Sequence, residues 1–163
     1  MPVEGSDEQK QTNEIGMFTA LLDAIEIKGK LITADALLTQ RKLAHYLVLR
    51  GAHYHFTAKG NQATLQDDIT LLFQKRAAPD FVEVSPPDHG RIETRRIWCS
   101  EALKDYLDFP HIGQVFPIER EVFHKKSGKH SLEIAVGLTS QTSAQASPQQ
   151  VLAANRRHWT IEN

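Results

Sequence analysis

The chain has 163 residues, of which 40% are apolar and 24% charged, and its formal net charge is −1. This composition is typical of a soluble globular domain and excludes disordered and fibrous classes. No apolar run is long enough to cross a membrane, and from the polar residues 1–14 we expect no secretory signal. The single cysteine, Cys99, excludes an internal disulfide and fits a reducing cytoplasm.

Helices and strands alternate in the first part of the chain. Apolar residues at helical spacing from Ile15 to Ile25 predict a helix, and the short apolar run at 31–34 predicts a buried strand. A second helix over residues 39–50 then precedes a second strand over residues 54–57. Short connections between such elements favour a parallel β-α-β unit, so residues 13–62 are expected to form an α/β core.

Residues 80–140 have the pattern of antiparallel strands, which we expect to form a β-rich insert. Leu132, Ile134, Val136 and Leu138 stand at every second position, so one face of that strand should be buried. Gly128 marks a hairpin turn. The positively charged side chains around this turn are Arg120, Lys125, Lys126 and Lys129.

A last helix is expected over residues 147–163. Ser147 is a favourable N-cap, Pro148 stands at the first helical position, and Gln150 at the third position completes a capping box. Helical spacing would then place Asn155, His158 and Glu162 on one face.

Two carboxylates are candidates for chemistry, each with a plainer alternative. Asp35 follows a buried strand, at the sheet edge where α/β proteins bind ligands, but a turn or cap residue there is also common. Glu162 alone would be a solvated helix carboxylate. If both faced one crevice, their hard oxygen ligands would suit a divalent metal.

Other polar clusters give weaker signals. His45, His53 and His55 suggest a metal site, although no cysteine or further carboxylate stands at a recognised ligand spacing. Arg156 lies in a basic cluster before Trp159, a combination that occurs both in nucleic-acid channels and on ordinary helix surfaces.

Four stretches, taken in order, resemble a known family. "DALLTQ", "KGNQ", "HGRIETR" and "HWTIEN" are similar to signature blocks of bacterial insertion-sequence DDE transposases of the ISAs and H-repeat-associated type. The resemblance runs from about Asn13 to the last residue. It implies a partial ribonuclease-H-like fold, in the α/β class, with an antiparallel β-rich insert before the C-terminal helix.

The resemblance also implies a chemistry and its residues. In the family, two Asp and one Glu hold two Mg²⁺ or Mn²⁺ ions for DNA cleavage and strand transfer. The second Asp corresponds to Asp35 and the Glu to Glu162. The first Asp has no counterpart, since Asp7 lies in a polar tail and Asp23 within a helix. We therefore expect a truncated transposase fragment that is inactive alone, or alternatively a non-catalytic DNA-binding remnant of a mobile element.

The implied partner is double-stranded DNA at insertion-sequence ends, in the bacterial cytoplasm and without a membrane. A second copy of the chain is a further candidate partner in the full-length form. Basic side chains on the insert and beside the catalytic Glu are the expected DNA contacts. They are Arg91, Arg95, Arg96, Lys125, Lys126, Lys129 and Arg156.

Overall fold

The computed structural model describes residues 16–35, 40–58, 63–74, 77–102, 109–155 and 161–162. Residues 16–23 are helical and precede the first strand. The remaining elements are β1 (Leu31–Asp35), α2 (Gln40–Leu49), β2 (His53–Ala58), α3 (Ala63–Leu72), β3 (Phe81–Val84), β4 (Arg91–Ile97), β5 (Gln114–His124), β6 (His130–Thr139), α4 (Pro148–Asn155) and β7 (Ile161–Glu162).

The predicted β-α-β unit is confirmed. β1 and β2 pair in parallel from Leu31 opposite His53 to Asp35 opposite Thr57, and α2 connects them. Leu43, Ala44 and Leu47 of α2 are fully buried against this pair. The spacing of three and four residues between them is the apolar stripe of a helix that covers a sheet.

All the strands belong to one mixed sheet in the order β3-β4-β5-β6-β2-β1-β7. The antiparallel strands expected over residues 80–140 are present as β3 to β6. They continue the α/β sheet directly, because β6 pairs antiparallel with β2. The chain is therefore of the α/β class with a sheet of mixed strand direction.

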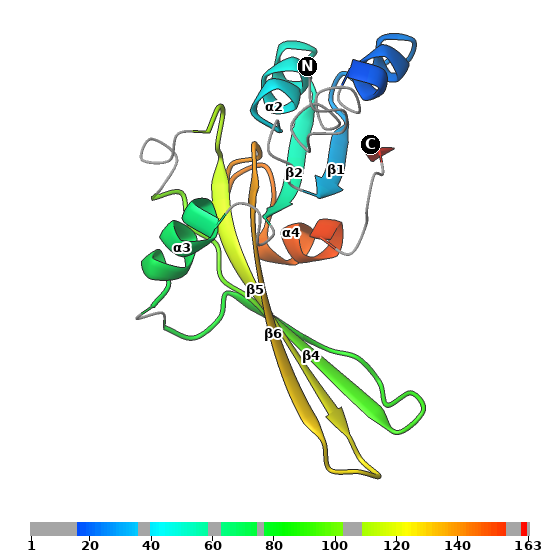
Figure 1. Ribbon diagram of the computed structural model, residues 1–163, viewed down its shortest axis with the longest axis vertical. Coiled ribbons are helices and arrows are strands. Elements are labelled where there is room, and N and C mark those ends of the chain that lie inside the picture. The colour runs from blue at the N-terminus through cyan, green and yellow to red at the C-terminus, as the bar shows by residue number, and fades with distance from the viewer. Residues whose placement is uncertain are drawn as a thin grey trace, which may run out of the picture.

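β5 and β6 are long strands that belong both to the central sheet beside β2 and to a part of the molecule that projects from it. Their inner ends lie beside β2, while their outer ends project with β4 away from β1, β2 and α2 (Figure 1). We call residues 91–96, 119–124 and 130–134 the arm, and residues 125–129 its tip. The expectation of one buried face along β6 holds only for Val136 and Leu138, because Leu132 and Ile134 lie on the arm and are exposed.

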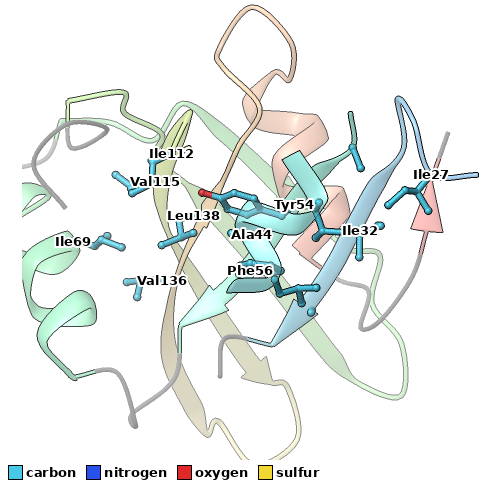
Figure 2. Packing of buried hydrophobic residues seen from close by; sticks show 14 of the residues in the cluster. Ile27, Ile32, Ala44, Tyr54, Phe56, Ile69, Ile112, Val115, Val136 and Leu138 are labelled. Atoms are coloured by element: carbon cyan, nitrogen blue, oxygen red, sulfur yellow. The ribbon is translucent and has the colours of Figure 1, made fainter. Parts of the chain in front are cut away.

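The main core lies around β2. Tyr54 and Phe56 are fully buried, and their rings stack at 4.7 Å between centroids (Figure 2). The Tyr54 hydroxyl donates a 2.8 Å hydrogen bond to the carbonyl of Pro110, which satisfies its polar end. Gly137 of β6 passes so close that a Cβ there would stand 2.5 Å from the Phe116 ring. Position 137 in the sheet therefore requires glycine.

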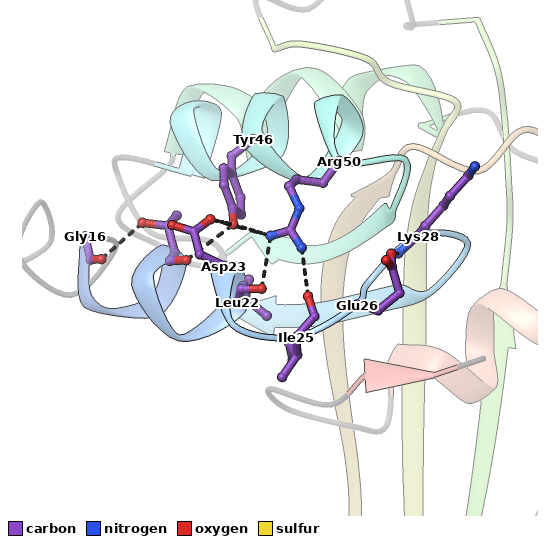
Figure 3. Close-up of polar contacts among 9 residues, drawn as sticks. Gly16, Leu22, Asp23, Ile25, Glu26, Lys28, Tyr46 and Arg50 are labelled. Atoms are coloured by element: carbon purple, nitrogen blue, oxygen red, sulfur yellow. Dashed lines mark hydrogen bonds and ion pairs between the residues drawn. The ribbon is translucent and has the colours of Figure 1, made fainter.

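A polar cluster ties the first helix to α2. The Arg50 guanidinium donates to the carbonyls of Leu22 at 3.0 Å and Ile25 at 2.7 Å, which lie at the end of helix 16–23 (Figure 3). Asp23 accepts a hydrogen bond from Tyr46 and pairs with Arg50 at 3.5 Å. Asp23 thus joins the first helix to Tyr46 and Arg50, whereas Asp7 lies outside the described residues.

The capping box of the last helix is confirmed, but the expectation that this helix includes Glu162 is wrong. The backbone N–H of Ser147 donates to the Gln150 side chain at 2.8 Å, and the backbone N–H of Gln150 donates to the Ser147 hydroxyl at 3.2 Å. The structure describes the helix as far as Asn155, and Ile161–Glu162 forms the strand β7 against β1. The outer edge of β1 offers unpaired backbone groups, which a β-branched residue such as Ile161 can pair with at low cost.

None of the helices that the structure describes has the length and apolar character needed to span a lipid bilayer.

Candidate functional site

Asp35 lies at the carboxyl end of the parallel strand pair. It is the last residue of β1, and its partner in the ladder is Thr57 of β2. The carboxyl ends of both strands open at the same edge of the sheet, which is where ligands bind in α/β proteins. The structure thus places the backbone of Asp35 where the sequence predicted it.

Asn155, the last residue of α4, is bound to this edge. Its carboxamide oxygen accepts a 2.9 Å hydrogen bond from the Thr57 hydroxyl and a 3.0 Å hydrogen bond from Nε2 of His55. These contacts fix the end of α4 beside the strand that neighbours Asp35. Sequence reasoning assigned no separate role to Asn155, although it begins the stretch "NRRHWTIEN".

His55 is fully buried within this contact. Burial lowers the pKa of His55 to about 4, against a smaller opposing effect of the hydrogen bond to Asn155. An amide oxygen can only accept, so Nε2 carries the proton and the imidazole is neutral. Nδ1 is buried and lacks a hydrogen-bond partner among the described residues. The ring is held in one tautomer beside Phe116, at 4.9 Å between centroids.

The three histidines considered as metal ligands do not converge. Nδ1 of His45 lies 3.1 Å from Nε2 of His111, and Nδ1 of His53 lies 3.1 Å from the Ser140 hydroxyl. His55 is bound to Asn155. Within the described part of the chain, no three His, Cys, Asp or Glu side chains are grouped so that they could hold a metal ion.

Glu162 lies at the other end of β1 from Asp35. It pairs with Leu31, the first residue of the strand, whereas Asp35 is the last. A strand rise of about 3.3 Å per residue puts about 13 Å of backbone between the two positions. The structure describes the backbone of both residues, and the two positions stand at opposite ends of the strand.

The arm arginines are held in ion pairs. Arg91 and Arg95 lie 3.3 and 2.9 Å from the carboxylate of Glu93. Arg96 lies on the opposite face, at 3.1 Å from Glu119 and 3.0 Å from Glu121. Their positive charge is therefore matched locally by carboxylates.

The tip lysines differ from these arginines. Lys125, Lys126 and Lys129 are exposed around Gly128, whose φ of 68° forms the turn. Across the described residues, no carboxylate forms an ion pair with any of the three. Exposed lysines without local partners are the side chains most available to phosphates. Arg156, the remaining basic candidate, lies outside the described residues.

Comparison with known proteins identifies a family to which the chain is similar. The family described as "Transposase DDE domain" matches residues 6–163. An uncharacterized protein from the dhlA 3′ region of Xanthobacter autotrophicus is 31% identical over 82% of this chain and 46% of its own length. The H repeat-associated proteins YbfD and YhhI of Escherichia coli (strain K12) are 33 and 26% identical over 61 and 94% of this chain.

These matches cover 41% of YbfD and 43% of YhhI, so the chain spans less than half the length of these relatives. No solved structure matches the chain.

Proposed function

Because the chain belongs to the transposase DDE family, we propose that it is the part of a DNA transposase that supplies two of the catalytic carboxylates and a DNA-contacting arm. We propose further that its sheet belongs to a ribonuclease-H-like fold. The contact of Asn155 with Thr57, beside Asp35, is the observation that carries this function. It brings the start of the C-terminal motif to the strand edge at which the family's second Asp is expected.

Asp35 and Glu162 are the proposed metal-binding residues, with Mg²⁺ or Mn²⁺ as the cation. Carboxylate oxygens are the ligands that these hard cations prefer. The ions would supply charge stabilisation for attack on phosphodiesters. Since the two residues stand at opposite ends of β1, and the family's first Asp has no counterpart in this sequence, this chain alone should form no complete site.

A plasmid-nicking assay with manganese tests the catalytic part of the proposal. The purified chain should nick no more than Asp35→Ala and Glu162→Gln variants. Nicking by the parent chain that both substitutions abolish would show that the chain completes a site by itself. Strand transfer that appears when the remaining catalytic Asp is supplied on a separate polypeptide would support the assignment of both carboxylates directly.

Double-stranded DNA at insertion-sequence ends is the proposed partner, and the tip lysines are its main contacts on the arm. Replacing Lys125, Lys126 and Lys129 with Ala should weaken binding to any DNA sequence. The slope of log K against log salt should fall by about 0.9 for each phosphate that the protein no longer neutralises.

A matched control is Lys42→Ala. Lys42 is an exposed lysine on α2, which lies at the far end of the molecule from the tip (Figure 1). Removing this charge should leave the slope unchanged. Equal effects of the tip and control substitutions would reject the tip as a phosphate-binding element.

The second candidate function is a DNA-binding module that occupies insertion-sequence ends without cutting them. The exposed lysines at the tip favour it independently of the carboxylates. Salt-dependent DNA binding without strand transfer, even when the missing Asp is supplied separately, would select this function over the first.

A further inference from the structure

The face of the arm that carries Glu93 contains an unfavourable pair of like charges. Arg95 of β4 lies directly opposite Arg120 of β5 in the antiparallel ladder. Like charges at directly opposed positions destabilise a strand pair. Arg91, two residues before Glu93, adds a third guanidinium to the same face, because side chains two residues apart in a strand share a face.

Glu93 lies among these three guanidinium groups and binds all of them. Its Oε1 accepts a 2.7 Å hydrogen bond from Arg120 and lies 3.3 Å from Arg91, while its Oε2 lies 2.9 Å from Arg95. The hydrogen bond from Arg120 lowers the pKa of Glu93, which outweighs the effect of burial. The carboxylate therefore stays ionised and joins β4 to β5.

The neighbouring acid on this face is much less constrained. Glu133 of β6 lies opposite Arg120 and pairs with it at 3.4 Å, but its side chain is 73% exposed, compared with 11% for Glu93. An exposed pair of this length contributes little to stability. On this face of the arm, Glu93 is thus the main charged link between β4 and β5, while Arg96 joins the same two strands through Glu119 and Glu121 on the opposite face.

We propose that Glu93 is a positioning residue for DNA binding: it holds the arm in the shape that presents the tip lysines to phosphates. This inference rests on the proposed DNA-binding function of the tip. Arg91, Arg95 and Arg120 then act as structural partners of Glu93, and the lysines make the phosphate contacts. The backbone ladders keep β4, β5 and β6 paired, but the arm encloses little core of its own, since Phe123, Leu132 and Ile134 are exposed and Val122 is its buried apolar side chain.

Glu93→Gln gives a test in which two effects have opposite signs. The substitution removes a negative charge near the DNA, so electrostatics alone predicts tighter binding and a steeper salt dependence. If Glu93 positions the arm, binding should weaken and the slope of log K against log salt should become shallower, by about 0.9 for each lysine that no longer reaches a phosphate. An unchanged slope overturns the proposal. A steeper slope also overturns it, because it would mean that Glu93 masks arginines that bind phosphate themselves.

Glu133→Gln is the matched control, since it removes the same charge from the same face. It should bind DNA at least as tightly as the parent chain, and its slope should not become shallower. A reduction equal to that of Glu93→Gln would show that charge removal on this face, and not the position of Glu93, causes the effect.

Two further measurements separate this inference from unfolding and from the function on which it rests. Titration with DNA at concentrations far above the dissociation constant gives the fraction of each variant that is able to bind, and the slope is independent of that fraction. The double variant Glu93→Gln with Arg95→Gln keeps the parent's net charge and removes the opposed arginine pair. Its slope should therefore be steeper than that of Glu93→Gln alone and closer to that of the parent chain. A slope equal to that of Glu93→Gln would overturn the proposal. If the lysine substitutions leave the slope unchanged, the proposed DNA-binding function of the tip is rejected. If they lower the slope but Glu93→Gln does not, only the positioning role of Glu93 is rejected.

Discussion

The carboxamide oxygen of Asn155 accepts a 2.9 Å hydrogen bond from the hydroxyl of Thr57. The same oxygen accepts from His55, so one side chain at the end of α4 satisfies two donors of β2. Replacing Asn155 with Leu would leave both donors without a partner in a largely buried site. We expect the free energy of unfolding to fall by about 1–3 kcal/mol for each donor left unsatisfied.

Urea denaturation of Asn155→Leu measures this change. Thr57→Val removes only one of the two donors and should cost less than Asn155→Leu. Gln149→Ala, at an exposed position of the same helix, should change stability by less than about 0.5 kcal/mol. Equal stability of Asn155→Leu and Gln149→Ala would show that α4 is held to β2 by its apolar side chains alone.

The stability of the fold should depend on the protonation of His55. Burial lowers the pKa of His55 to about 4 in the folded chain, while an unfolded histidine titrates near its ordinary value of about 6.5. Between these values the unfolded chain binds a proton that the folded chain does not, so stability falls as pH falls. From pH 7 to pH 5 the loss from this residue should be about 2 kcal/mol.

Denaturation of the parent chain and His55→Gln at several pH values tests this prediction. The variant should show a shallower dependence of unfolding free energy on pH over this range. His53, whose pKa burial also lowers, remains in both proteins and accounts for part of the residual slope. Parallel curves would mean that His55 titrates alike in the folded and unfolded states.

Gly137 should tolerate no side chain. A Cβ at this position would lie 2.5 Å from the Phe116 ring and 2.7 Å from the backbone oxygen of Phe56, so the sheet would have to shift. We expect Gly137→Ala to destabilise the fold by about 1–3 kcal/mol, the usual cost of overpacking. Gly16→Ala is the control, because nothing lies within 4 Å of its added Cβ and Ala favours a helix. In thermal denaturation the midpoint should therefore fall for the first variant and stay level or rise for the second.

Cys99 should react slowly with thiol reagents in the folded chain. Burial raises the pKa of its thiol to about 12, and the nearby Asp80 carboxylate adds to the shift. The thiolate is the reactive form, so at pH 8 only about one molecule in ten thousand would carry it. Iodoacetamide labelling followed by mass spectrometry should be far slower in buffer than in urea. Similar rates under the two conditions would contradict a half-buried, protonated thiol.

Local sequence patterns were sufficient for the elements whose neighbours lie close in the chain. The parallel pairing of β1 with β2 follows from two apolar strands separated by one helix. The reciprocal hydrogen bonds of Ser147 and Gln150 follow from a spacing of three residues. In both cases the physical partners are near in sequence, so periodicity and capping rules identify them.

Contacts between distant parts of the chain could not be predicted in this way. The roles of Asn155 and Glu93 depend on which strands become neighbours, and neither residue type indicates its partner. Glu162 was expected on a helix because helical spacing aligns it with Asn155, but Glu162 instead pairs antiparallel with Leu31 at the edge of β1. The part of the site that the sequence did predict, Asp35 at a strand end, depends on one local boundary.

The pairing of β2 with β6 has a consequence for synthesis on the ribosome. Residues of β2 find their partners in β6 only across a long stretch of chain, as in the hydrogen bond between Thr139 and the carbonyl of Tyr54. At about 5–20 residues per second, translation needs on the order of 10 s to reach β6 after β2 has been made. Throughout that interval one edge of β2 lacks its partner, so the nascent chain exposes a strand edge that can pair with other chains until β6 is made.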